Sequence, residues 1–194
     1  MSKEIKVTVY NINELEDSIK TKVLDKYRYN SVDVDWYHPV YDDFFAELER
    51  YGIEADIEFT GFYSQGDGAS FITTTCDTDL LIRTLFEEGH DIPENALLDS
   101  KNLSVRIDRM NSRYLHEETM YVDIHDEDMA LSDLESETLN DIIEEWAKEK
   151  ARDLYRKLES YYEDITSDKE VIEYLADSEF FQNGDIIKYS ELGL

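Results

Sequence analysis

Residues 53–76 read IEADIEFTGFYSQGDGASFITTTC, and this stretch decides the fold class. Apolar residues alternate with acids from Ile53 to Phe59, which is the period of a strand with one buried face. Glycines then break the pattern, and Asp67-Gly68 is a strong hairpin signal. The β-branched and aromatic segment Ser70–Cys76 follows as the returning strand. We therefore expect an antiparallel pair of strands joined by a glycine-rich connection.

The same periodicities extend over the rest of the chain. Alternation predicts further strands at Ile5–Val9, Leu103–Ile107 and Met120–Ile124. Apolar spacing of three and four predicts helices at 15–27, with Asn13 as N-cap, at 36–51 and at 77–88. In the C-terminal part, a Ser132/Glu135 capping box opens a long helix, and a second box, Ser167/Glu170, opens a helix that ends at about residue 183. The predicted class is α+β: a largely antiparallel sheet of about four to five strands, with amphipathic helices packed on one face and a long C-terminal helix.

The chain is long enough for one well-packed domain, and we expect a single acidic α+β domain over residues 1–194. It holds 19 Lys and Arg against 47 Asp and Glu, a net charge of −28. The charge is uneven: residues 1–52 (a strand and two helices) carry −4, residues 53–128 (the sheet region) −13, and residues 129–194 (the helical tail) −11. Most of the excess negative charge therefore lies in residues 53–194, after the first quarter of the chain.

This charge excludes several classes of function. A chain without excess Lys and Arg cannot bind a nucleic-acid backbone through a basic surface, and an anionic membrane would repel it. No apolar run is long enough to span a bilayer, and the N-terminus has no apolar signal-peptide core. Cys76 is the single cysteine, which fits a reducing compartment. We expect no direct nucleic-acid or membrane partner and a cytoplasmic location.

Residues with catalytic or metal-binding chemistry form no recognisable site. The glycine connection lacks the Gly-Lys-Ser/Thr of a phosphate-binding loop, and a strand rather than a helix follows it. His125-Asp126-Glu127-Asp128 offers ligands for a divalent cation but has no EF-hand spacing, and the four histidines show no zinc spacing. We expect no enzyme activity, no cofactor and no metal.

The charge itself suggests a function. About 28 charges match roughly 48 Å of duplex DNA, or about 14 base pairs, and a compact chain of this length is about 40 Å across. Glu54, Asp56 and Glu58 would project from one strand at intervals of about 6.6 Å. The glycine connection could present its own side chains to the same partner, or its glycines could serve the turn alone. The predicted partner-binding residues are Glu54, Asp56, Glu58, Tyr63, Ser64, Gln65, Asp67 and Asp123.

The segment Thr60-Gly61-Phe62-Tyr63-Ser64-Gln65-Gly66-Asp67-Gly68-Ala69-Ser70-Phe71 resembles a hairpin found in small acidic proteins encoded by tailed bacteriophages and prophages. The likeness extends to an opening strand and helix (7–29), a Trp-Tyr acidic helix (36–49), a Leu-Tyr-x-x-Leu-Glu helix (154–162) and a Thr-Ser-Asp-x-Glu cap (166–170). Tyr63 stands where Trp is common in that family. The resemblance implies a phage context, with a location in the cytoplasm of a bacterial host cell, and a role like that of anti-CRISPR and other anti-defence proteins.

The leading hypothesis is a phage-encoded counter-defence inhibitor. It would bind a bacterial nuclease, either a CRISPR effector or a restriction enzyme, and block nucleic-acid access by DNA-like negative charge. A second hypothesis is an interaction module that does not mimic DNA, such as an antitoxin-like neutraliser or a phage assembly factor. A third is a metal-dependent enzyme that uses carboxylates. The sequence leaves the target open, and also the choice between a monomer and a homodimer.

Overall fold

The computed structural model describes residues 6–30 and 32–191. Contacts divide the chain into two compact units. The central unit is Tyr37–Glu159, and the terminal unit combines the chain up to Trp36 with the chain from Ser160 onward. Each unit is described by itself below, and the single domain over residues 1–194 stays a prediction.

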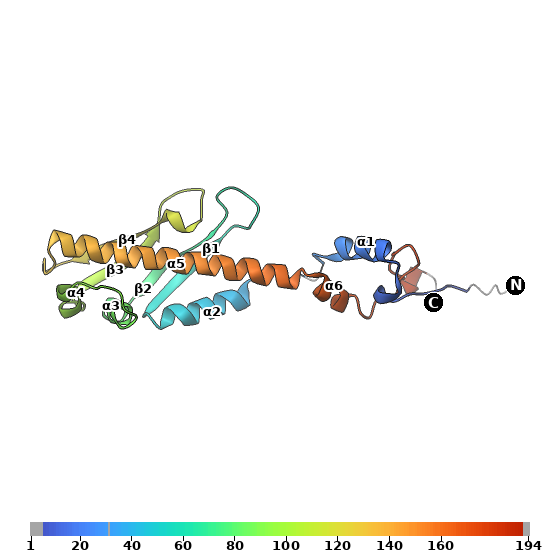
Figure 1. The fold of residues 1–194 in the computed structure, drawn as a ribbon, viewed down its shortest axis with the longest axis horizontal. Helices are drawn as coiled ribbons and strands as arrows, with labels where there is room; N and C mark the ends of the chain where they lie inside the picture. The colour runs from blue at the N-terminus through green and yellow to red at the C-terminus, as the bar shows by residue number, and fades with distance from the viewer. Residues whose placement is uncertain (1–5, 31, 192–194) are drawn as a thin grey trace. The chain divides into compact units, whose positions relative to one another are not determined.

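The strands of the central unit form two hairpins (Figure 1). Strand β1 (Ile53–Phe59) pairs antiparallel with β2 (Ala69–Cys76), and β3 (Leu103–Arg109) pairs antiparallel with β4 (Met120–Asp126). The α+β class and the antiparallel pairing are confirmed. The prediction of one sheet with four to five strands was wrong, because the described chain has two sheets of two strands each.

The division between the hairpins lies at Thr73 on β2. The register of β1 and β2 shifts between Glu54 and Ala55, which leaves Thr74 as an extra residue in β2. Beside this bulge the Thr73 hydroxyl accepts a hydrogen bond from the backbone N–H of Ile107 and donates one to its carbonyl, both at 3.1 Å. A side chain thus satisfies the β3 groups that a continuous sheet would pair with backbone. The alternation of residue types along the chain carries no sign of this substitution.

Helices pack against the apolar faces of these hairpins. The unit contains α2 (His38–Glu49), α3 (Thr78–Glu87), α4 (Glu94–Leu98), a short 3-10 turn η2 (Glu117–Thr119) and most of α5 (Asp133–Ile165). Phe44 of α2 meets Phe71 of β2 edge to face with ring centroids 5.5 Å apart. Along β3, Leu103, Val105 and Ile107 are buried while Ser104 and Arg106 are exposed. One face of the second hairpin is therefore solvated, as its alternation predicts.

The long helix α5 begins as the sequence predicts. Glu135 accepts from the Ser132 backbone N–H at 2.9 Å, and the Ser132 hydroxyl accepts from the Glu135 N–H at 3.3 Å, so the capping box is formed. Trp146 is buried against Tyr51, at 4.7 Å between ring centroids. The helix reaches Ile165, which confirms the long C-terminal helix.

The N-terminal part of the terminal unit differs from the prediction. Residues 6–9 belong to no ladder, Val7 and Val9 are exposed, and Ile5 lies outside the described residues. The expected N-cap at Asn13 was also wrong. Asn11 and Glu14 form the capping box, which opens a 3-10 turn, η1 (Ile12–Glu14), before α1 (Asp17–Tyr27). The box spacing occurs at 11/14 as well as 13/16, and local spacing alone could not choose between them.

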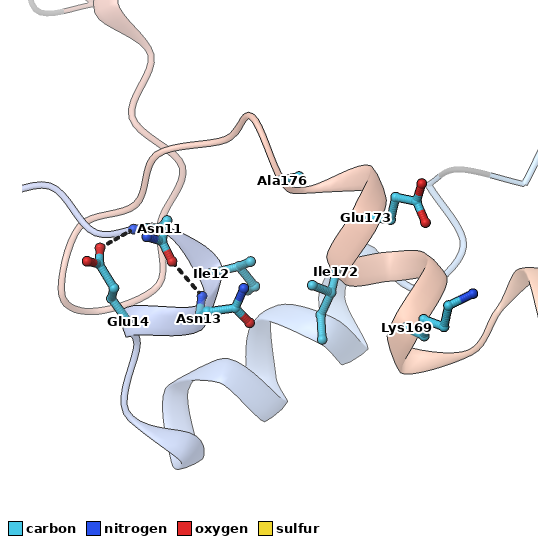
Figure 2. A pocket seen from close by; sticks show the side chains of 8 residues that line it. All are labelled: Asn11, Ile12, Asn13, Glu14, Lys169, Ile172, Glu173 and Ala176. Atoms are coloured by element: carbon cyan, nitrogen blue, oxygen red, sulfur yellow. Dashed lines mark hydrogen bonds between the residues drawn. The ribbon is translucent and has the colours of Figure 1, made fainter.

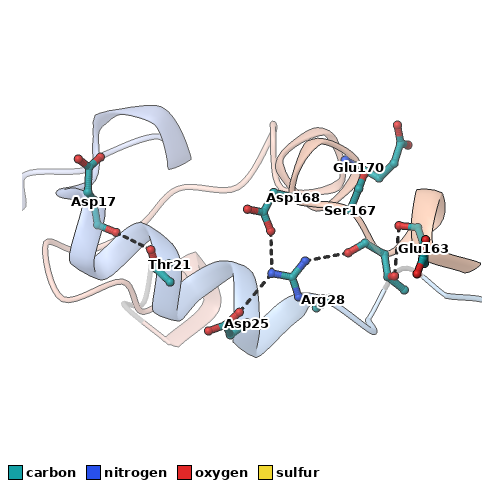
Figure 3. A network of polar contacts seen from close by, with 9 residues as sticks. Asp17, Thr21, Asp25, Arg28, Glu163, Ser167, Asp168 and Glu170 are labelled. Carbon is teal, nitrogen blue, oxygen red and sulfur yellow. Dashed lines mark hydrogen bonds and ion pairs between the residues drawn. The ribbon is translucent and has the colours of Figure 1, made fainter. Parts of the chain in front are cut away.

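Arg28 joins the two ends of the chain within the terminal unit (Figure 3). Its guanidinium donates to the Thr166 carbonyl at 2.8 Å and to the carboxylates of Asp168 at 2.6 Å and Asp25 at 3.2 Å. The hydrogen bond to Asp168 is the largest cause of a raised Arg28 pKa. These bonds hold α1 beside the start of α6 (Asp168–Tyr174).

The last helix is shorter than expected. Ser167 caps α6, because its hydroxyl accepts from the Glu170 N–H at 3.4 Å, but α6 ends at Tyr174 and not near residue 183. Beyond it, Phe180 forms isolated antiparallel bridges with Tyr10 and with Ile186, and a 3-10 turn, η3 (Tyr189–Glu191), follows.

Candidate partner-binding surface

The connection between β1 and β2 is held in shape by Asp67. Its carboxylate accepts hydrogen bonds from the backbone N–H groups of Tyr63 at 3.0 Å and Ser64 at 2.7 Å. Asp67, predicted as a contact residue, thus has a structural partner within its own loop. Tyr63 is 84 % exposed, and Ser64 and Gln65 are exposed beside it. The loop displays these three side chains on an ordered backbone.

The glycines of this loop allow close packing by the connection between β3 and β4. A Cβ on Gly66 would lie 1.9 Å from the Tyr114 ring, and one on Gly68 would lie 2.5 Å from the His116 Cα. The N–H of Leu115 donates to the Gly66 carbonyl at 3.2 Å. The glycines therefore serve the turn and its packing, while Tyr63 at the tip remains available for contact.

The three predicted acids of β1 have different surroundings. Glu54 is exposed and accepts from the Thr75 hydroxyl at 2.9 Å. Glu58 forms an ion pair with Arg109, which lies 51 residues away in sequence. Asp56 is exposed and has no ion pair among the described residues. The charge of Glu58 is thus already compensated, and Glu54 and Asp56 carry the outward charge of this strand.

Asp123 lies apart from the other predicted residues. It is exposed on β4 and pairs in register with Arg106 of β3, which itself forms an ion pair with Asp108 at 2.5 Å. The structure thus brings together the β1 acids and the loop that follows them, and places Asp123 in the other hairpin.

The cations of the central unit are largely used inside it. Residues 37–159 hold 11 Lys and Arg and 31 Asp and Glu, a net charge of −20. Eight of the 11 cations form ion pairs with carboxylates of the same unit. Lys150 and Lys157 of α5, for example, both bind Glu47 of α2, at 2.6 and 2.9 Å. Most acids of this unit are left without a cationic partner among the described residues.

The pKa of Glu47 reflects its contacts with Lys150 and Lys157. Burial alone would raise it, but the hydrogen bonds from Lys150 and Lys157 outweigh burial and lower the pKa. Burial lowers the pKa of Lys150 and its contact with Glu47 raises it, with a net rise. Lys150 and Lys157 therefore link α5 to α2.

A row of acids on α5 is the feature that sequence reasoning missed. Six exposed carboxylates follow one another at intervals of four residues, about 6 Å apart along the helix axis: Asp133, Glu137, Asp141, Glu145, Glu149 and Asp153. We call them the acidic row. Taken from the sequence alone, the Lys and Arg of this helix indicate a poorer anionic surface than the sheet. The signal was present, because residues 114–147 contain 12 acids and no Lys or Arg.

Burial raises the pKa of the Cys76 thiol to about 11, which keeps the thiol protonated at neutral pH.

Within residues 6–30 and 32–191, no three His, Cys, Asp or Glu side chains lie close enough to share a metal ion. No helix in that part of the chain has the length and apolar character needed to cross a membrane.

The terminal unit carries a separate hollow between η1 and α6 (Figure 2). Its volume is about 610 Å³, and Ile12 and Ile172 lie among polar side chains such as Asn13, Lys169 and Glu173. None of the predicted partner-binding residues lines it.

Comparison with known proteins shows a family match. A family model described as "Domain of unknown function (DUF8835)" matches residues 36–168, which span the whole central unit. No curated protein and no solved structure matches the chain.

Proposed function

The chain belongs to the DUF8835 family, and from its charge distribution we propose that it is a phage-encoded counter-defence inhibitor. It binds a bacterial nuclease, a CRISPR effector or a restriction enzyme, and blocks nucleic-acid access with DNA-like negative charge. One observation carries the proposal: eight of the 11 cations of the central unit form ion pairs inside it, while most of its acids have no cationic partner among the described residues.

The acidic row supports the proposal on energetic grounds. Like charges four residues apart on a helix destabilise it by about 0.2–0.5 kcal/mol per pair, and the row contains four such neighbouring pairs before Asp153, whose charge Arg156 compensates at 3.3 Å. Solubility requires a net charge of only about 2 to 8 in magnitude for a small domain. A chain that keeps this repulsion beyond the need for solubility uses it for binding, and a basic nucleic-acid cleft is the surface that it suits.

The experiment measures inhibition of purified CRISPR effectors and restriction endonucleases by the chain, and its affinity for each that responds. Two charge variants test separate surfaces: Glu54→Lys with Asp56→Lys on β1, and Asp141→Lys with Glu145→Lys on α5. Glu58 is left unchanged, because a lysine there would face Arg109. We expect at least a ten-fold loss of affinity from one pair or both. Unchanged affinity in both variants would contradict mimicry.

A second candidate function is favoured by the ordered loop around Tyr63. An antitoxin-like neutraliser or a phage assembly factor would depend on this exposed aromatic side chain more than on charge. Tyr63→Ala is the matched variant, since it removes contact area without altering charge. If Tyr63→Ala abolishes binding while both lysine variants retain it, the second function holds and the first does not.

A further inference from the structure

Three large apolar side chains are strongly exposed at one end of the central unit. Leu98, the last residue of α4, is 76 % exposed, Met129 in the turn after β4 is 87 % exposed, and Leu134 in the first turn of α5 is 71 % exposed. Figure 1 shows α4 and the start of α5 at the same end of this unit. The Asn95 amide donates to Glu135 at 2.9 Å, which ties α4 to the turn that holds Leu134. We call Leu98, Met129 and Leu134 the apolar tip.

The backbone of the tip is held in an unfavourable conformation. Met129 has φ 51°, and it is the non-glycine residue with positive φ in the described chain. The Asp126 carboxylate fixes the turn, because it accepts from the N–H groups of Leu131 at 2.9 Å and Ala130 at 3.2 Å. The bond from Leu131 is the largest cause of a lowered Asp126 pKa. Strain of this kind persists where surrounding contacts impose it, and here it projects an apolar side chain into solvent.

The charges around the tip restrict what can cover it. Residues 84–100 and 114–147 contain 17 acids and no Lys or Arg, and Arg83, which lines a hollow together with Leu98, forms an ion pair with Asp79 at 2.8 Å. A second copy of the chain would bring the same acids against each other, so its approach is opposed by like-charge repulsion. A surface that accepts both the acids and the three apolar side chains must be basic and must contain an apolar recess.

We propose that the apolar tip is a protein-contact surface that seats in an apolar recess ringed by Lys and Arg on the partner. The inference rests on the proposed function for the basic character of that partner. Salt screens the attraction between the acids and a basic partner but does not weaken a buried apolar contact. The tip therefore adds a source of specificity that charge alone does not provide. Met129 suits this role, since an unbranched thioether side chain adapts to irregular surfaces.

The test uses two synthetic peptides of equal charge, (Lys-Leu)7 and (Lys-Ser)7, and the full chain. Calorimetry at 500 mM NaCl, where charge is screened, measures the affinity for each. We expect the wild-type chain to bind (Lys-Leu)7 at least ten-fold more tightly than (Lys-Ser)7. Met129→Ser with Leu134→Ser removes most of this preference. Val34→Ser, an equally exposed apolar residue of the terminal unit, retains it.

The possible results separate the two proposals. The proposal for the apolar tip is overturned if the wild-type chain binds the two peptides equally well. It is also overturned if the double variant keeps the preference for (Lys-Leu)7. A preference that the double variant loses supports the tip, even if no nuclease in the inhibition assay responds. Sedimentation at several concentrations examines the other occupant: a dimer of the wild-type chain that the double variant cannot form would assign the tip to a second copy and overturn the basic partner. Thermal unfolding confirms that the variants fold.

Discussion

Gly66 shows how one residue fixes the shape of the candidate binding loop. It has φ 97°, and the Tyr114 ring occupies the place of a Cβ. Gly89 has almost the same φ, 96°, with no atom within 4 Å of the position that a Cβ would take. The two glycines therefore share the backbone requirement and differ in packing.

Gly66→Ala is expected to lower the free energy of unfolding by about 3 kcal/mol or more, because it adds a steric clash to backbone strain. Gly89→Ala should cost about 1–2 kcal/mol, which is the strain alone. Urea unfolding of both variants measures the difference. Equal losses would show that Tyr114 does not pack on Gly66 as described.

Glu47 links α2 to α5, and its lowered pKa predicts a pH dependence. A carboxylate whose pKa is lower in the folded state stabilises the fold above its unfolded pKa, and this contribution is lost as the pH falls through the folded pKa. Glu47→Gln should therefore destabilise the protein at pH 7, and the difference from wild type should shrink below the ordinary value of 4.5.

Thermal unfolding between pH 7 and pH 3 measures this effect, with Glu49→Gln on the exposed side of the same helix as control. A loss in Glu47→Gln that stays constant over this range would rule out the proposed ion-pair origin. The sequence predicted both residues as acids on α2, but it could not show that only Glu47 meets Lys150 and Lys157, which lie more than 100 residues away.

At the scale of elements, local patterns predicted the strands of the central unit and its long helix. Alternation located β1, β3 and β4, β-branched and aromatic residues located β2, and the Ser132/Glu135 box marked the start of α5. The grouping of strands was missed because it depends on Thr73, whose hydroxyl bonds to a strand 34 residues away. Nothing within β2 itself distinguishes that threonine from its neighbours.

Thr73→Val removes the hydroxyl that bridges the hairpins and leaves the N–H and C=O of Ile107 without this partner. We expect a loss of about 1–3 kcal/mol in the free energy of unfolding. Thr75→Val, which removes an exposed hydroxyl bonded to Glu54, should cost less. Denaturant unfolding compares the two, and an equal effect would mean that the Thr73 bridge does not join the hairpins.

The acidic row makes a prediction in which stability and binding move in opposite directions. Asp141→Lys converts two repulsive pairs, with Glu137 and Glu145, into attractive ones, and should stabilise α5 by about 1–2 kcal/mol while weakening partner binding. Glu144→Lys changes the charge equally but breaks the ion pair with Lys148 at 2.7 Å, so it should destabilise the protein. Thermal unfolding of the two variants measures whether each one stabilises or destabilises the protein. Destabilisation by Asp141→Lys would show that the row carries no repulsion.

At the scale of the whole molecule, the net charge of −28 separates into −20 in the central unit and −8 in the terminal unit. The sequence predicted the excess, but not which acids remain unpaired, since pairs such as Glu58 with Arg109 form between distant segments. It therefore assigned the anionic surface to β1 and overlooked the acidic row. The family match covers the central unit, where most of the charge lies.

The central claim is that this charge occupies a nucleic-acid cleft. The most direct measurement is competition between the chain and duplex DNA for a nuclease that it inhibits, at NaCl concentrations from 50 to 500 mM. We predict that DNA and the chain exclude each other, and that the affinity of the chain falls at least ten-fold over this range as salt screens the acids. An affinity that does not change with salt, or a complex that binds DNA and the chain together, would contradict the claim.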